Sequence, residues 1–168
     1  MNQIINDIKI IKNFFLKDER GYNLKINHDN SFSPKDILIT YNLERHTLRG
    51  FHYRKDFKEE KIITCIQGKI FDVIVDLRKK SNSYLSWNVN EISSKDNKSI
   101  YCPAGCAHAY LTLSKNTLVH YAINIEYDSN FDKGFIWNDS TINVKWPHFP
   151  KIISEKDLNL KKLKTLGF

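Results

Sequence analysis

Glycine and proline are scarce in this sequence, with six glycines and four prolines among 168 residues. Disordered and low-complexity chains are rich in such residues and poor in apolar ones, whereas 41% of this chain is hydrophobic and 12% is aromatic. We therefore expect a folded protein. The length predicts a single domain over residues 1–168.

Long hydrophobic runs are also lacking. The first apolar residues are interrupted by Asp7, Lys9 and Lys12, so this region has neither the apolar core of a signal peptide nor the length of a membrane span. Cysteine is rare, and the three cysteines form no C-x-x-C pair. We expect a cytoplasmic protein without membrane contact, in which the thiols are reduced and structural.

Acidic residues are outnumbered, because 26 Lys and Arg against 19 Asp and Glu give a net charge of +7. The lysines are scattered and are densest from Lys156 to Lys164, where a solvated helix face would account for them. We therefore expect no nucleic-acid partner. A small anion such as a diphosphate needs only two or three converging arginines or lysines, which makes it the simpler use of this charge.

Short apolar runs separated by polar turns recur about every ten residues, a pattern typical of an antiparallel sandwich or barrel. Around the turn Gln67-Gly68, the strand 70–77 alternates so that both of its faces are apolar and both should be covered. In the tail, Ser154 and Asp157 have the form of a capping box that opens a short C-terminal helix. The expected extended segments are 4–15, 22–26, 37–41, 48–53, 62–66, 70–77, 84–92, 100–102, 107–113 and 118–125.

Three ionisable side chains on separate predicted strands suggest proton-transfer chemistry. An unperturbed imidazole titrates near pH ~6.5, so His52 could act as a base. Lys61 could stabilise the negative charge of an enolate, and the phenol of Tyr121 could donate a proton. A base, a cation and an acid are what proton abstraction beside a ketone requires. The alternative for His52 is a core histidine that hydrogen-bonds a backbone carbonyl.

A metal site is the main chemical alternative. The six histidines include no H-x-H or H-E-x-x-H pair, although a site made of His52, His108 and Asp72 is compatible with the spacing.

Several motifs, in order and spread over nearly the whole chain, resemble those of the dTDP-4-dehydrorhamnose 3,5-epimerase family. Its L-R-G-L-H-Y and G-E-V-F-D-V-x-V-D-L-R correspond to Leu48–Tyr53 and Gly68–Arg78. Its P-x-G-F-A-H-G-F corresponds to Pro103–Tyr110. The shorter matches are D-E-R-G at Asp18–Gly21, W-N-D at Trp137–Asp139, W-P at Trp146–Pro147 and S-E-K-D at Ser154–Asp157.

This resemblance implies a cupin-type jelly roll that forms a homodimer and uses neither a metal nor an organic cofactor. The implied reaction is epimerisation of a nucleotide-linked 4-keto-6-deoxy sugar at carbon 3, carbon 5 or both. By position, His52 would be the base and Asp157 its carboxylate partner, Lys61 the enolate stabiliser and Tyr121 the acid. Asp157 could instead only cap the helix, with its oxygens facing backbone amides.

The resemblance also implies how the nucleotide sugar is held. Arg20 and Arg49 would bind the diphosphate and Tyr127 would stack on the base, while His108 and Asp72 would line the pocket. The arginines could instead form surface ion pairs with Asp18 or Glu19. Tyr127 could be ordinary core packing, and His108 and Asp72 a buried polar pair that satisfies itself.

Departures from the family motifs leave the nucleotide open among dTDP, GDP, CDP and UDP. The family's R-G-F-F-x-E becomes Arg20–Lys25, which ends in the opposite charge. The stretch 40–47 is short and lacks the family's Gln-x-Asn. Functional alternatives are a metal-dependent cupin enzyme, a 3,4-ketoisomerase and a non-catalytic nucleotide-sugar-binding cupin. A homodimer is also favoured physically, because the extended segments 8–15 and 22–26 could cover an exposed sheet edge of a neighbour.

Overall fold

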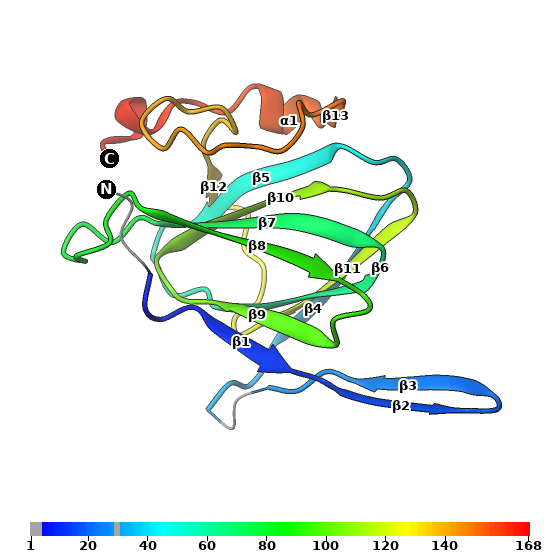
Figure 1. The fold of residues 1–168 in the computed structure, drawn as a ribbon. Coiled ribbons are helices and arrows are strands. Elements are labelled where there is room, and N and C mark those ends of the chain that lie inside the picture. Colours follow the sequence, from blue (N-terminus) through cyan, green and yellow to red (C-terminus); the bar gives the residue numbers. More distant parts are fainter. Residues whose placement is uncertain (1–4, 29–30) are drawn as a thin grey trace.

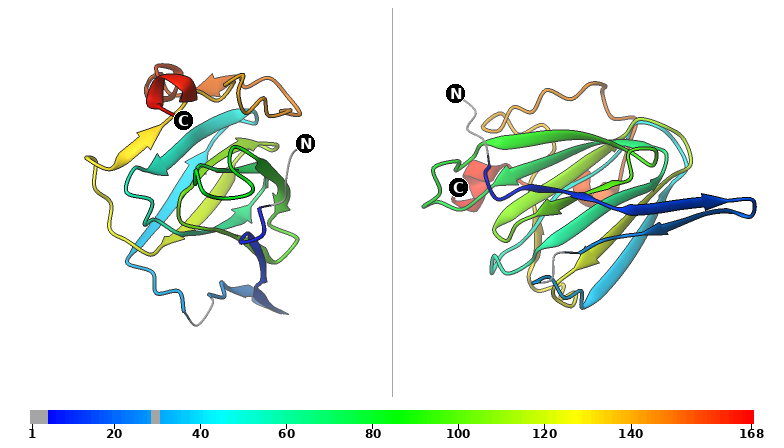
Figure 2. Two further views of the ribbon diagram at one scale, coloured as in Figure 1. Left: turned by 90° about the vertical axis from the view of Figure 1, so that its left-hand side faces the viewer. Right: turned by 60° about the horizontal axis from the view of Figure 1, so that its bottom comes forward.

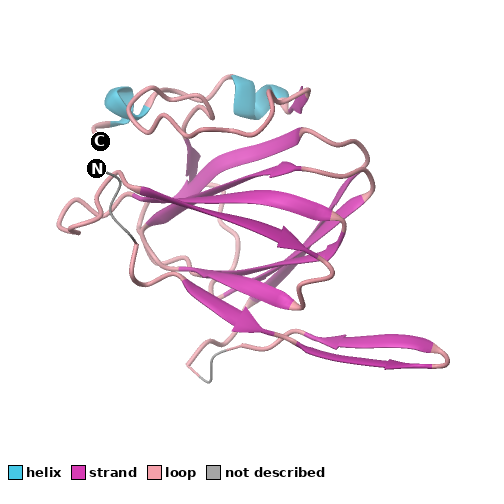
Figure 3. Ribbon diagram, in the orientation of Figure 1, coloured by secondary structure: helices cyan, strands magenta, loops and turns pink. Residues whose placement is uncertain are grey.

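A computed structural model describes residues 5–28 and 31–168, and two antiparallel sheets packed face to face form most of it (Figure 1). Figure 3 shows that helix is confined to the C-terminal part. The first sheet has the order β1 (Lys9–Lys12), β9 (Lys98–Cys102), β6 (Lys61–Gln67), β11 (Thr117–Ile123), β4 (Asp36–Asn42). The second has the order β12 (Asp132–Gly134), β5 (Thr47–Arg54), β10 (Cys106–Thr112), β7 (Lys69–Asp76), β8 (Trp87–Ser93), with β13 (Ile152–Ile153) parallel to β5.

The second sheet is covered on both faces, as the alternation in strand 70–77 predicts. Ile70 and Ile74 pack between the two sheets with residues of β6 and β11. Phe71, Val73 and Val75 point the other way, into a second core beneath the C-terminal segment, which lies across β5 in Figure 1. The all-β prediction with a short C-terminal helix is therefore confirmed.

Several strand boundaries and the helix differ from the prediction. β8 begins at Trp87 rather than at residue 84, because residues 84–86 form a turn in which Leu85 has a positive φ of 60°. Helix α1 (Glu155–Leu158) has a single turn, followed by the 3-10 helix η1 (Leu163–Leu166). The expected helix face from Lys156 to Lys164 is thus wrong. The strands β12 and β13 are too short to be recognised from the sequence.

Two of the extended segments expected near the N-terminus pair as a hairpin. β2 (Phe14–Asp18) pairs with β3 (Gly21–Lys25), and Figure 2 shows this hairpin projecting beyond the two sheets. β1 pairs with β9 of its own chain and forms one edge of the first sheet. The expected extended segment from residue 4 begins outside the described residues, which also omit 29 and 30.

All three cysteines are free and buried, as predicted for structural thiols. Burial raises the pKa of Cys65 and of Cys106 to about 12. Among the described residues no helix has the length and apolar character needed to cross a membrane.

Candidate active site

His52 and Asp157 form a hydrogen-bonded pair between β5 and the C-terminal segment. The Nε2 atom of His52, on β5, lies 2.7 Å from Oδ1 of Asp157, on α1. The side chain of Asp157 is 4% exposed and that of His52 is 32% exposed. His52 is therefore anchored by a buried carboxylate and is still partly accessible, unlike a core histidine that bonds a backbone carbonyl.

The second oxygen of Asp157 is held by the backbone of β5. The amide of Gly50 donates to Oδ2 of Asp157 at 3.1 Å. Gly50 has a φ of +109°, and a Cβ at this position would lie 2.6 Å from the carbonyl oxygen of His108 on β10. Glycine is required here because the strand must approach β10 closely in a conformation that other residues rarely adopt. The register between β5 and β10 shifts at this point.

The carboxylate of Asp157 pairs with His52 and does not cap the helix. The backbone amide of Asp157 donates to Oγ of Ser154 at 3.1 Å, so Ser154 does cap α1. Its carboxylate is directed at His52 and Gly50 instead of at the helix amides. Burial raises the pKa of Asp157, but the hydrogen bond and positive charge of His52 and the amide of Gly50 outweigh burial, so the pKa is lowered overall. The carboxylate therefore stays ionised beside the imidazole.

A cavity of about 190 Å³, which we call the inner cavity, opens beside His52 between the two sheets. Its lining combines apolar side chains with the basic and phenolic groups singled out from the sequence. It is lined by Leu38, Thr40, Arg49, His52, Lys61, His108, Tyr121 and Ile123. A second hollow of about 350 Å³, the outer cleft, shares Arg49 and His52 and is also lined by Lys156 and Asp157. His52 thus borders both spaces.

Lys61 and Tyr121 belong to the first sheet, across the inner cavity from His52. Lys61 pairs in register with Ile123 and lies diagonally from Tyr121 on the same face of β6 and β11. Its Nζ lies 2.7 Å from Oε2 of Glu59, a partner that the sequence analysis missed although the two residues are only two positions apart. The structure therefore brings His52, Asp157, Lys61 and Tyr121 together as the resemblance implies.

His108 and Asp72 form a second buried histidine–carboxylate pair. Nε2 of His108 lies 2.5 Å from Oδ2 of Asp72, and the ring of His108 meets the ring of Tyr121 edge-on with centroids 5.8 Å apart. Oδ1 of Asp72 has no hydrogen-bond partner within the described part of the chain. The pair is therefore not fully self-satisfied, and His108 contributes to the wall of the inner cavity.

Arg49 is held in place by a residue that the sequence analysis passed over. Its Nε donates to Oδ1 of Asn42 at 2.9 Å, and the amide nitrogen of Asn42 donates to the carbonyl of Thr117. Asn42 is buried at the end of β4. Within the described part of the chain, Arg49 forms no ion pair with Asp18 or Glu19, and it lines both the inner cavity and the outer cleft.

Arg20 and Tyr127 lie outside the inner cavity. Arg20 sits in the turn of the projecting β2–β3 hairpin, where its Nη2 pairs with Oδ2 of Asp18 at 2.6 Å, the surface ion pair considered above. Tyr127 is 68% exposed and lines a shallow hollow with Arg54 and Asp128, so ordinary core packing is wrong for it. The structure does not bring either residue to His52 within one chain.

In the described segments, no group of three or more His, Cys, Asp or Glu is placed to hold a metal ion, and His52 and His108 each hydrogen-bond a carboxylate through Nε2.

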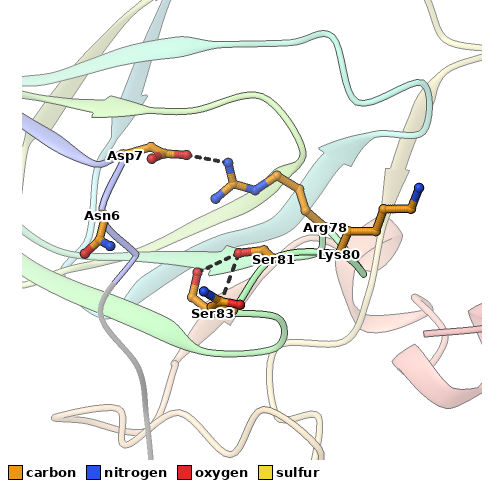
Figure 4. A pocket seen from close by; sticks show the side chains of 7 residues that line it. Asn6, Asp7, Arg78, Lys80, Ser81 and Ser83 are labelled. Atoms are coloured by element: carbon orange, nitrogen blue, oxygen red, sulfur yellow. Dashed lines mark hydrogen bonds and ion pairs between the residues drawn. The ribbon is translucent and has the colours of Figure 1, made fainter.

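A larger hollow of about 680 Å³ lies elsewhere (Figure 4). There Nη1 of Arg78 lies 2.6 Å from Asp7, and its other nitrogens bond Asp76, so the guanidinium joins the N-terminal segment to β7.

Comparison with known proteins decides the family. The family model described as dTDP-4-dehydrorhamnose 3,5-epimerase matches residues 2–165. The chain belongs to this family. It is 34% identical to the dTDP-4-dehydrorhamnose 3,5-epimerase of Methanothermobacter thermautotrophicus, over 88% of this chain and 84% of that protein. The Shigella flexneri enzyme of the same name is 30% identical, over 94% and 92%.

Solved structures agree with the family assignment. The Bacillus anthracis dTDP-4-dehydrorhamnose 3,5-epimerase, crystallised with TDP and PPi, superimposes with a TM-score of 0.87 at 32% identity over 94% of each chain. The Mycobacterium tuberculosis epimerase gives a TM-score of 0.89 at 24% identity over 99% of this chain and 89% of that one, which supports the cupin-type jelly roll. The epimerase-family chain is thus an isomerase that epimerises a nucleotide-linked 4-keto-6-deoxy sugar, as in deoxysugar biosynthesis. The metal-dependent, ketoisomerase and non-catalytic alternatives are not favoured.

Proposed function

We propose that this epimerase uses His52 as its base, Asp157 to orient and charge-stabilise the imidazole, Lys61 to stabilise the enolate and Tyr121 as the opposing acid. The observation that carries the proposal is the His52–Asp157 pair beside the inner cavity, at 2.7 Å. Because Nε2 of His52 faces Asp157, its other ring nitrogen, Nδ1, is the atom that would take the proton.

A ketone at carbon 4 acidifies the protons on carbons 3 and 5, so one base can act at either carbon once the sugar is seated. Abstraction moves the C–H electrons into the ring to form an enolate, whose oxygen would lie against the ammonium of Lys61. His52 and Tyr121 belong to different sheets. His52 would therefore remove a proton from one face of the carbon, and Tyr121 would supply a proton to the opposite face. The carbon is thereby inverted.

The substrate in this proposal is a dTDP-linked sugar, since the matching relatives are named for dTDP-4-dehydrorhamnose and the Bacillus anthracis structure holds TDP. Arg49 would bind the diphosphate, because its guanidinium borders both spaces and is held by Asn42. His108 and Asp72 would line the sugar pocket. Stacking of Tyr127 on the base and a cytoplasmic location stay predictions.

A homodimer is part of this proposal. β4 is one of the two edge strands of the first sheet, and Ile37, Ile39 and Tyr41 on it are each more than half exposed. The hairpin β2–β3 also exposes apolar side chains, including Phe14 and Leu16. A twofold dimer in which these surfaces cover each other would remove both from water. Arg20 on the hairpin would then serve the neighbour's substrate site rather than its own.

Deuterium wash-in tests the proposal. The protein is incubated in heavy water with dTDP-, GDP-, CDP- and UDP-linked 4-keto-6-deoxy sugars, and label at carbons 3 and 5 is followed by NMR. We expect rapid label and inversion with the dTDP sugar, and none after His52→Ala. Label that persists in His52→Ala would exclude His52 as the base. A clear preference for another nucleotide would overturn the dTDP assignment and leave the base unaffected.

A further inference from the structure

Lys61, the proposed enolate stabiliser, is held by an ion pair that is largely buried. Its Nζ lies 2.7 Å from Oε2 of Glu59, and the two side chains are 14% and 19% exposed. Among the described residues, Lys61 lines the inner cavity and Glu59 does not. Glu59 is therefore placed to act on the reaction through Lys61 and not by contact with the sugar.

A lysine at this position needs such a partner. Its ammonium lies at the end of a flexible aliphatic stem and donates hydrogen bonds in directions that rotation leaves open. The carboxylate of Glu59 fixes the ammonium and uses one of its donors, so the remaining donors are available to the oxygen of the enolate. Because the pair is mostly removed from water, it holds the ammonium more firmly than an exposed pair would.

The backbone on both sides of Glu59 is tied to the strand that carries Tyr121. Asn124 immediately follows this strand, β11. The side chain of Asn124 donates from Nδ2 to the carbonyl of Lys58 at 3.1 Å and accepts at Oδ1 from the amide of Glu60 at 2.8 Å. The backbone amide of Asn124 also donates to the carbonyl of Glu60 at 3.2 Å. One side chain thus binds both neighbours of Glu59 and fixes Glu59 relative to β11.

We propose that Glu59 is a positioning residue for Lys61 and that it holds the ammonium beside the carbon-4 oxygen of the substrate. The inference rests on the proposed role of Lys61 as the enolate stabiliser. When His52 removes the proton, the C–H electron pair enters the ring and the negative charge moves to the carbonyl oxygen. An ammonium that is already in place stabilises this charge without first having to reorganise.

The oxygen of Glu59 matters more than its charge in this proposal. Alanine removes the acceptor and frees the ammonium, and a displacement of about 1 Å in a reacting group can cost about 100-fold in rate. Glutamine keeps an acceptor oxygen at the same distance from the backbone. Since Lys61 acts on charge that develops in the transition state, its displacement should lower kcat and leave KM almost unchanged.

The test is proton exchange in heavy water with the nucleotide 4-keto sugar that the wild type uses, followed by NMR. We expect Glu59→Ala to lower kcat for exchange by roughly 10- to 100-fold with KM within about threefold of the wild type. Glu59→Gln should restore kcat to within about threefold. The control is Glu60→Ala, because Glu60 adjoins Glu59 in the chain but lines a different hollow with Tyr101. This control should keep the wild-type rate.

A double variant separates positioning from a general effect on the fold. Lys61→Met has no ammonium to hold, so adding Glu59→Ala to it should lower the exchange rate by less than about twofold. A further fall as large as the one in the wild-type background would overturn the role of Glu59. Wild-type kcat in Glu59→Ala, or a Glu59→Gln variant as slow as Glu59→Ala, would overturn it as well.

Failure of this inference differs from failure of the proposed mechanism. A slow Lys61→Met together with an unaffected Glu59→Ala would overturn the role of Glu59 alone and leave the epimerase mechanism intact. If Lys61→Met exchanges protons at the wild-type rate, the role of Lys61 fails and that of Glu59 fails with it.

Discussion

Nε2 of His52 and Oδ1 of Asp157 lie 2.7 Å apart although 105 positions separate them in the chain. Their meeting depends on the C-terminal segment, because β13 pairs with the beginning of β5 and Ser154 then caps the single turn that carries Asp157. The segment that covers the outer face of the second sheet thus also delivers a carboxylate to the site.

Removal of the Asp157 charge should leave His52 in place but weaken it as a base. In Asp157→Asn, the imidazolium that forms on proton abstraction loses its ionised partner, so we expect kcat to fall by roughly 10²- to 10⁴-fold. Steady-state kinetics with the nucleotide 4-keto sugar measure the effect. The control is Asp132→Asn, whose carboxylate pairs with the exposed Lys156. Equal activities of the two variants would contradict a catalytic role for Asp157.

Lys61 should matter for charge rather than for folding. Lys61→Met keeps the length of the side chain and removes the cation, so we expect kcat to fall by roughly 10²- to 10³-fold, the usual effect of losing an oxyanion stabiliser. Lys98→Met provides the control, because Lys98 also pairs with a carboxylate but lies at the start of β9. Proton exchange by Lys61→Met at the wild-type rate would contradict the role of Lys61 in stabilising the enolate.

Tyr121→Phe should separate proton exchange from inversion. The base His52 remains, so carbon-bound hydrogen still exchanges with heavy water, whereas the opposite face of the carbon receives no proton from a phenol. We expect labelled substrate of unchanged configuration and a loss of inverted product of at least about 100-fold. NMR of the reaction mixture distinguishes the two. Inverted product at the wild-type rate would rule out Tyr121 as the acid.

Asp76 should make stability depend on pH. Burial raises its pKa, but hydrogen bonds from Arg78, Ser81 and Ser83 and from the Arg78 backbone outweigh burial and lower it from 3.8 to about 2. A group whose pKa is lowered on folding stabilises the protein above its unfolded pKa, and that contribution is lost as the pH falls from about 4 toward about 2.

The matching variant is Asp76→Asn, measured by urea unfolding at several pH values. We expect it to be less stable than the wild type by about 2 kcal/mol at neutral pH and to show a flatter loss of stability below about pH 4. Parallel pH profiles for the two proteins would contradict this assignment.

The proposed dimer predicts a specific surface mutant. Ile39→Lys adds a charge to the exposed face of the edge strand β4, where Ile39 is 56% exposed. We expect the wild type to sediment as a dimer and Ile39→Lys to sediment as a monomer, because a buried unpaired charge is costly at an interface. Phe149→Lys is the control, since Phe149 is 79% exposed on the C-terminal segment. A wild type that sediments as a monomer at all concentrations would contradict the proposed dimer.

Strand positions were largely predictable because their signal is local. The alternation of side chains in strand 70–77 indicated that both faces of the strand are buried, and its residues do divide between two cores. Gly68, with a φ of +87°, forms the expected turn. β12 and β13 were not predictable, since two or three residues carry no period. The helix was overestimated because a capping signal marks where a helix begins and does not set its length.

The sequence singled out His52 and Asp157 because each belongs to a quoted motif, and Lys61 and Tyr121 through their chemistry and their positions in the family. Glu59, Asn42 and Tyr110 were missed as site residues because their importance lies in their partners. Asn42 matters since Arg49 and Tyr110 both donate to it, and Glu59 since it pairs with Lys61. For Tyr110 the sequence held one signal, its position two residues after His108. Side chains two apart on a strand point the same way, so Tyr110 could be expected on the face that carries His108.

The sequence by itself determined the all-β architecture, the types of reactive group and the family they resemble, because alternation, turn residues and motifs are written along the chain. Only the tertiary structure decided which of these groups meet. It seated Asp157 against His52, tied Arg49 to Asn42 and left Arg20 on a projecting hairpin. Such contacts depend on the packing of two sheets and a C-terminal cover, which short-range patterns do not specify.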